Sequence, residues 1–319
     1  MRDYIIRRLL ILPIIMIGVS FLTFAVFNFL IPGNVCHLRL GIGATEETVT
    51  ACEEEHGLNR PWYEQYGDWL TGIPQGDFGE SLKEGALPVS TELERRLPIT
   101  LELLLMTLFF SLLLGIPPGV LSAIRPNTPG DWVSRILSVF WLSIPSFYLG
   151  ILIITFASIW FGWTPPQFGI SYVSFIDDPL TNLEEFVLPS LVLALGTSAV
   201  IMRLTRSAML EVMRNDYIRT AWSKGLRERT VVWRHALKNA MIPVVTVVGL
   251  QIGALIGGAV LIESVFNLNG VGKYTLESIV YRDFFVVQSL VLMFAAVYVT
   301  VNLLVDIAYA WLDPRIHYG

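Results

Sequence analysis

Hydrophobic residues gather in long stretches along the whole chain, and most of the polar segments between them are short. A helix needs about 20 residues to cross the roughly 30 Å hydrocarbon core of a bilayer. The fourth stretch is the shortest, and we expect its helix to continue past Arg203 and Arg206, whose long side chains can snorkel to water. The pattern predicts an all-α membrane protein with six transmembrane helices, at Leu9–Ile31, Ile99–Ile124, Trp132–Trp160, Val187–Met202, Met241–Ile262 and Phe284–Leu312.

Composition agrees with this pattern, because 54% of the 319 residues are hydrophobic and only 15% are charged. A soluble domain of this length does not bury so much apolar surface. The first stretch exceeds the roughly 7–15 apolar residues of a signal peptide, so we interpret it as a signal anchor. Pro145 and Pro189 fall inside predicted helices and predict kinks there, with a role in gating as the alternative.

The charges predict the orientation, because basic residues favour the cytoplasmic side. Arg2, Arg7 and Arg8 precede the first helix, which predicts cytoplasmic termini for an even number of helices. The loop after the fourth helix is basic, whereas the segments after the first and third are acidic. The basic loop holds Arg214, Arg219, Lys224, Arg227, Arg229, Arg234 and Lys238; the acidic segments hold Glu53, Glu54, Glu55, Asp177, Asp178, Glu184 and Glu185. Among the loops between helices, basic residues cluster only in this one, and nothing indicates a nucleic acid as partner.

The segment from 32 to 98 is too long for a simple connection and should carry structure of its own. Thr45 is a suitable cap for a helix that starts with Glu46 and Glu47 and ends at His56 and Gly57. A second helix follows, with Trp62, Tyr66, Trp69 and Leu70 on one face for the membrane interface or for the protein's own spans.

Both cysteines of the chain, Cys36 and Cys52, lie in this segment, where an oxidising environment favours a disulfide. Two alternatives stay open. One is a zinc site formed with His37 and His56, whose spacing matches no compact finger pattern, and the other is a pair of free thiols.

The basic loop between the fourth and fifth helices predicts a short helix ending at Gly225 and a second helix leading to Pro243. The first of these offers Tyr217, Ile218, Ala221 and Trp222 for packing into a groove on a partner. The alternative is that its charges only hold the loop against anionic lipid.

This loop resembles the EAA loop of ATP-binding-cassette (ABC) importer permeases, with Ala221, Gly225 and Leu237 in register. Arg219, Thr220, His235 and Lys238 depart from the general motif in the manner of the dipeptide and oligopeptide branch. Further similarity covers almost the whole chain, at 4–13, 30–33, 57–61, 76–82, 96–102, 143–149, 263–266 and 312–315. Cys36 and Cys52 are not part of the family pattern.

The resemblance implies the type I importer permease fold, with a sizeable extracytoplasmic segment between the first two helices. It divides the chain into 1–31, the tail and first span; 32–98, the extracytoplasmic segment; 99–312, the transmembrane core with a coupling loop at 213–241; and 313–319, a cytoplasmic tail. The implied coupling helix, at about Asp216 to Arg227, would contact an ATPase subunit. Its residues are Asp216, Tyr217, Ile218, Arg219, Thr220, Ala221, Lys224, Gly225, Leu226 and Arg227.

The resemblance also implies the partners: a second homologous permease, two cytoplasmic ATPases that bind ATP and magnesium, and an extracytoplasmic solute-binding protein. The chain itself would hold no cofactor and would not be an enzyme, in the cytoplasmic membrane of a bacterium or archaeon. Gly270 to Lys273 lacks the Ser or Thr and the first glycine of a phosphate-binding loop, so we interpret it as an outer turn.

Polar residues inside predicted spans are candidates for the transport pathway, with hydrogen bonding between helices as the alternative. These are Glu102, Gln251, Glu263, Asn302 and Asp306. The resemblance favours import of peptides, and other members of the branch carry oligosaccharides, nickel chelates or glutathione. A proton-coupled secondary transporter is the rival class, but it would predict an internal repeat that the sequence does not display. A scaffold without transport activity would leave the chain-wide similarity unexplained.

Overall fold

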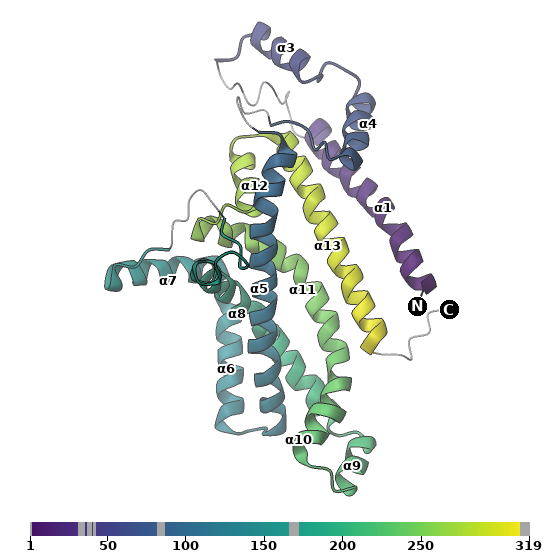
Figure 1. The fold of residues 1–319 in the computed structure, drawn as a ribbon, viewed down its shortest axis with the longest axis vertical. Helices are drawn as coiled ribbons and strands as arrows, with labels where there is room; N and C mark the ends of the chain where they lie inside the picture. The colour runs from purple at the N-terminus through teal and green to yellow at the C-terminus, as the bar shows by residue number, and fades with distance from the viewer. Residues whose placement is uncertain are drawn as a thin grey trace. The chain divides into compact units, whose positions relative to one another are not determined.

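A computed structural model of the chain describes residues 2–30, 36, 40, 43–81, 87–165 and 172–312, without the side chains of 2–8, 306 and 308–312 (Figure 1). Most of the described residues are helical, with no strand among them, as the hydrophobic pattern predicts. The chain divides into two compact units. The central unit contains Thr100–Leu268 and Thr300–Gly319, and the N-terminal unit contains Arg2–Ile99 and Asn269–Val299.

Five helices of the described residues are long and apolar enough to cross a membrane. Helix α1 (Arg2–Ala25) continues into a π-helical turn, and α10 (Glu228–Thr230) leads through another π-helical turn into α11. The predicted fourth span is confirmed in its extension, because α8 continues well past Arg203 and Arg206. The other bounds are α5 Val89–Ile124, α8 Pro179–Val212, α11 Leu237–Phe266 and α13 Phe284–Leu312.

The predicted third span is wrong as a single helix. The chain forms α6 (Pro129–Ser143) and α7 (Ser146–Phe161), which are bent by 95° at the break between them (Figure 1). Pro145 is the N-cap of α7, and Ile144 before it takes an extended conformation with φ −107° and ψ 121°. A proline disfavours the helical conformation of the residue before it, so the expected kink becomes a break. Pro189, by contrast, lies inside an uninterrupted α8.

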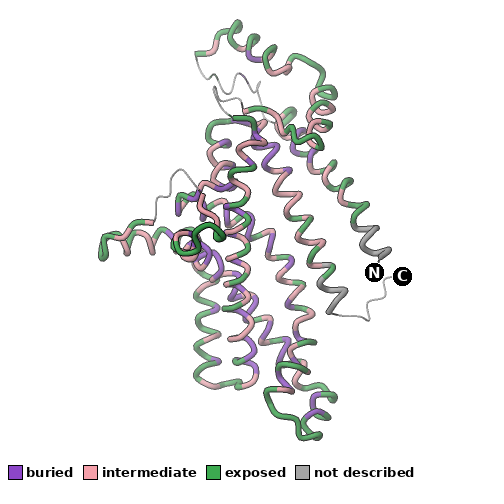
Figure 2. Tube along the Cα trace, viewed as in Figure 1, coloured by how far each residue is buried: buried purple, intermediate pink, exposed green. Residues whose placement is uncertain are grey.

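Buried residues are concentrated along α8 and α11, whereas α6 and α7 are largely exposed (Figure 2). On α7, Phe156 is 59% exposed and Trp160 is 73% exposed. Such apolar exposure is expected of a helix that faces lipid or another membrane subunit.

Small residues bring α5 and α8 into close contact within the central unit. Ser111, Gly115 and Gly119 follow one another at intervals of four, and Ser111 Oγ donates a hydrogen bond to the Ala194 carbonyl at 3.4 Å. A Cβ atom added at Gly119 would lie only 2.7 Å from the Met202 carbonyl oxygen. Membrane helices use such small residues because their association depends on close backbone approach.

The N-terminal unit contains the two short helices predicted between the first two spans, α3 (Glu46–Glu55) and α4 (Trp62–Gly72). The Thr45 side chain accepts a hydrogen bond from the Thr48 amide and caps α3, and Gly57 follows with φ +63°. On α4, the Tyr66 ring centroid lies 5.2 Å from that of Phe24 of α1, and the Tyr66 hydroxyl lies 2.9 Å from Ser20 Oγ. The aromatic face of α4 therefore packs on the protein's own first span.

The same unit contains α12 (Val271–Val280), a helix that the sequence did not lead us to expect. The outer turn expected from Gly270 to Lys273 is instead the start of this helix, with Gly270 as its N-cap residue. Its neighbour Val271 is fully buried in a cluster with Val89, Val286 and Leu290.

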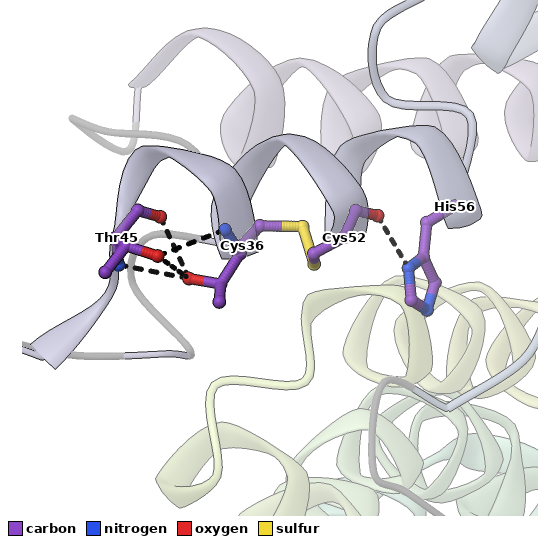
Figure 3. Close-up of a disulfide and its surroundings, with 5 residues drawn as sticks. Cys36, Thr45, Cys52 and His56 are labelled. Atoms are coloured by element: carbon purple, nitrogen blue, oxygen red, sulfur yellow. Dashed lines mark hydrogen bonds between the residues drawn. A yellow bond between two sulfur atoms is a disulfide. The ribbon is translucent and has the colours of Figure 1, made fainter.

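A disulfide joins Cys36 to Cys52 and attaches the preceding segment to the middle of α3 (Figure 3). It excludes the proposed zinc site in this state, because neither sulfur is a thiolate, and it excludes free thiols. His56 instead places Nδ1 at 2.9 Å from the Cys52 carbonyl oxygen, and its ring stacks on Phe285. His37, the fourth residue of the zinc hypothesis, lies outside the described residues.

Candidate functional site

The loop that carries the EAA resemblance forms α9 (Asp216–Ser223), seated on the central unit by its apolar face. Ile218 is 0% exposed and Ala221 is 7% exposed. These two side chains belong to a cluster that we call the α9 seat. Its other buried members are Val120 and Ala123 of α5, Ala208 and Met209 of α8, and Val231, Val232, Ala236 and Ala240 of the helix that follows α9. Movement of α9 would therefore act on α5, α8 and α11 together.

The opposite face of α9 is open, with Tyr217 41% and Trp222 42% exposed. The prediction that Tyr217, Ile218, Ala221 and Trp222 all offer themselves to a partner is thus half wrong, since Ile218 and Ala221 pack inside the chain. Tyr217 is held in place because its hydroxyl accepts a 2.7 Å hydrogen bond from Asn239 Nδ2. Arg219, Thr220 and Lys224 are exposed beside the two aromatic rings.

Gly225 ends α9 as predicted, in the left-handed conformation with φ +72°. Its amide donates to the Trp222 carbonyl at 2.9 Å, and the Leu226 amide donates to Ala221 at 3.4 Å. This is the hydrogen-bonding pattern of a glycine that ends a helix. The helix is shorter than predicted, because Arg227 is already the N-cap of α10. The helix that follows also does not stop at Pro243, which lies inside α11.

A buried ion pair lies beside the α9 seat and joins three helices. Arg206 of α8 donates from Nε to Asp131 Oδ1 at 2.8 Å and from Nη2 to Asp131 Oδ2 at 2.9 Å. Ser122 of α5 donates to the same carboxylate, as does the Asn127 amide at 2.9 Å. Asp131 of α6 is 0% exposed, whereas the Arg206 side chain is 21% exposed. We call Ser122, Asp131 and Arg206 the clamp.

The sequence did not reveal the clamp, and the prediction that Arg206 snorkels to water is wrong. Arg203, on the other hand, is exposed. The one local signal in the sequence was Asp131, which lies three residues after the helix cap Thr128. An acidic residue is favourable there because the first turn of a helix has a positive potential. Its partner on α8 is distant in sequence, so only the packed helices reveal the pair.

The candidate pathway residues have different surroundings. Glu263 is fully buried and accepts a 2.7 Å hydrogen bond from Thr100 Oγ1. Glu102 accepts a 2.5 Å hydrogen bond from the Tyr172 hydroxyl. Burial, together with that hydrogen bond, raises the pKa of Tyr172 far above its usual value, so this donor stays protonated. Asn302 is half-buried on α13, and the side chain of Asp306 lies outside the described residues.

Gln251 has a different setting, because it lines a cavity of 220 Å³ within the central unit. Trp141 and Ser146, on either side of the break between α6 and α7, line the same cavity. The break predicted only as a kink therefore borders a hollow between α8 and α11, whose other walls include Thr197 and Gly258.

Comparison with known proteins agrees with the resemblance of the loop. The family model described as binding-protein-dependent transport system inner membrane component matches residues 115–318, and that of the N-terminal part of such membrane components matches 1–104. The chain belongs to this family. It is a multi-pass membrane protein and a permease subunit of the ABC importer class.

Three relatives match along their full length and along all of this chain. The dipeptide transport system permease protein of Alkalihalophilus pseudofirmus and the oligopeptide transport system permease protein of Bacillus subtilis are each 38% identical to it. The glutathione transport system permease protein of Escherichia coli K12 is 36% identical. The identification of the dipeptide and oligopeptide branch is thereby confirmed.

Proposed function

We propose that this permease subunit imports peptides or solutes of similar size. The names of its relatives support this solute class, since they include carriers of dipeptides, oligopeptides and glutathione. The assembly we propose contains a second homologous permease, two cytoplasmic ATPases that bind ATP and magnesium, and an extracytoplasmic solute-binding protein. If α6 and α7 count as one bent span, six spans place both termini in the cytoplasm, with residues 32–98 outside.

In this assembly α9 is the coupling helix, and its position carries the proposal. It presents Tyr217 and Trp222 outward while its other face is embedded in the α9 seat. An ATPase that closes on ATP would pull on these exposed rings, and the seat would pass the movement to α5, α8 and α11. The clamp would make α6 follow α8, which would change the cavity at the break that leads into α7.

The cavity lined by Gln251 is the part of the pathway that we favour. A side-chain amide both donates and accepts hydrogen bonds, which suits the peptide bonds of many different solutes. Glu263 and Glu102 already accept hydrogen bonds from Thr100 and Tyr172, which supports a structural role for these two carboxylates.

Reconstitution tests the proposal. In proteoliposomes that also contain the second permease and the ATPases, a peptide-loaded binding protein should raise ATP hydrolysis and drive uptake of the peptide. Uptake that persists without the ATPases and collapses with the proton gradient would instead identify a secondary transporter.

Truncating the exposed rings of α9 should weaken binding of the ATPase subunits. Aromatic anchors at the centre of an interface contribute about 2 kcal/mol or more, so Tyr217→Ala with Trp222→Ala should reduce affinity roughly 30-fold or more. Trp160→Ala removes an even more exposed ring from α7 and is the matched control, which should bind normally. Affinity would be measured by titrating labelled ATPase into nanodiscs that contain the assembled permease pair.

Changes that disturb α9 without removing the rings should uncouple the assembly. Reversing the charges of Arg219 and Arg227, or introducing valine at Gly225, should leave the protein inserted while ATP hydrolysis no longer produces uptake. Valine is strained at φ +72°, because its branched Cβ opposes the left-handed conformation. Normal uptake per ATP in both variants would show that α9 does not couple the subunits.

A further inference from the structure

The N-terminal unit contains a second hollow, of 490 Å³, which none of the features above explains. Six segments line it: α1, the end of α3, the turn at 57–60, α4, the segment 77–80 and the start of α13. Its volume falls in the range of about 300–1,000 Å³ that is usual for ligand pockets. The disulfide of Cys52 lies one helical turn before His56, which is part of the wall, so the α3 side of the hollow is covalently anchored.

The walls of this hollow are strongly acidic. Five carboxylates line it against one guanidinium, that of Arg60, which pairs with Asp68 at 2.6 Å. The carboxylates come from three separate segments and converge only in the folded protein. They are Glu54, Glu55, Asp68, Asp77 and Glu80.

The acidic end of α3 conflicts with local electrostatics. Glu53, Glu54 and Glu55 occupy the last turn of the helix, where the backbone carbonyls already create a negative potential. Acidic residues are unfavourable there and favourable in the first turn, where Glu46 and Glu47 lie. Such conflicts between local preference and structure are expected at functional sites. A cation bound in the hollow would reduce the unfavourable interaction between these glutamates and the carbonyl end of α3.

The other residues that line the hollow offer apolar and polar contacts to a molecule that carries a cation. Phe24, Trp69 and Phe285 contribute aromatic surface. Gln288 also lines the hollow and is 4% exposed, yet its side chain makes no hydrogen bond within the described part of the chain. Its amide can both donate and accept hydrogen bonds, so a ligand in the hollow could supply the partner that the described part of the chain does not.

We propose that this hollow binds a guanidinium or ammonium group carried on an aliphatic chain. The carboxylates neutralise the charge, the aromatic rings contact the alkyl stem and the cation, and Gln288 hydrogen-bonds a polar group of the carrier. The group could belong to a basic peptide being imported or to a lysine or arginine of the solute-binding protein. Access from the binding-protein side rests on the proposed function and its topology, whereas the binding chemistry does not.

Direct binding to the full chain tests the chemistry without transport. In nanodiscs, N-acetylarginine amide should bind at least about tenfold more tightly than its neutral analogue N-acetylcitrulline amide, and this preference should shrink at high salt. Glu54→Gln with Glu55→Gln should remove most of the preference, and Gln288→Leu should weaken binding of both probes. Glu46→Gln with Glu47→Gln, which removes the same charge from the other end of α3, should bind like the parent protein. Equal affinity for both probes, or equal loss in both double variants, would overturn the proposal.

Two further measurements distinguish the sources of the cation. If the solute supplies it, Glu54→Gln with Glu55→Gln should slow uptake of basic peptides and leave that of neutral peptides unchanged. If the binding protein supplies it, the same variant should weaken docking of the binding protein whichever peptide it carries. A variant that loses the arginine probe but changes neither measurement would mark an adventitious cation site and overturn the functional assignment. Loss of coupling at α9 would affect none of the binding results, so failure of the two proposals can be told apart.

Discussion

Replacing Arg206 by methionine should destabilise the protein by about 3–5 kcal/mol, the largest effect that we expect of a single substitution. The change leaves the Asp131 carboxylate fully buried without its bidentate partner. Asp131→Ala should have a smaller effect, because the Arg206 side chain is 21% exposed and can turn towards water. Thermal unfolding of the purified chain in detergent, followed by tryptophan fluorescence, would measure both.

The double variant shows whether the two residues act as a pair. Combining Asp131→Ala with Arg206→Met removes both charges and should be more stable than Arg206→Met alone, which a sum of independent effects cannot produce. Arg95→Gln is the control, since Arg95 is 59% exposed and lies 3.4 Å from its partner Glu92. That exposed pair should contribute at most about 1 kcal/mol. The clamp would not exist as described if Arg206→Met unfolded no more easily than Arg95→Gln.

Gly119→Ala should lower stability by about 1–3 kcal/mol by forcing α5 away from α8. The added Cβ would lie 2.7 Å from the Met202 carbonyl oxygen and 2.8 Å from Thr205 Cβ. Backbone cannot turn aside as a side chain can, so the helices themselves must separate. We expect a lower unfolding temperature and, in the reconstituted assembly, less uptake per ATP, because α5 and α8 both form the α9 seat.

Gly257→Ala is the matched control for this substitution. Gly257 lies in α11, and an added Cβ there meets no atom within 4 Å. The variant should be neutral or slightly stabilised, because alanine favours helix more than glycine does. Equal stability of Gly119→Ala and Gly257→Ala would show that α5 and α8 do not approach as closely as the structure indicates.

The short helices show which features were predictable from the sequence. The start of α3 at Thr45 and the ends of α3 and α9 at glycine depend on neighbours a few residues away, so local signals were sufficient. By contrast, α12 was missed, because it is a ten-residue helix whose position depends on burying Val271 against Val286 and Leu290. Those contacts are distant in sequence.

At Pro145 the sequence predicted a change of the right kind but too small, a kink where the structure has a break between two helices. Proline at this position predicted a kink, as did Pro189, yet one ends a helix and the other continues through α8. The sequence assigns both residues the same missing donor and the same fixed φ. The surroundings make the difference: Pro189 is buried in α8, whereas Pro145 is exposed at a break whose flanks line a cavity.

Sequence by itself determined the membrane character, the approximate spans, the α9 segment and the family, because hydropathy, caps and motif spacing are local properties of the chain. The sequence also favoured a disulfide between the two cysteines, but only the structure excluded the zinc site and the free thiols. Only the tertiary structure decided that Arg206 faces Asp131 instead of water, that Ile218 and Ala221 point inward, and that acidic residues from three segments surround one hollow. A side chain's partner and its exposure depend on what packs against it, and residues distant in sequence supply that packing.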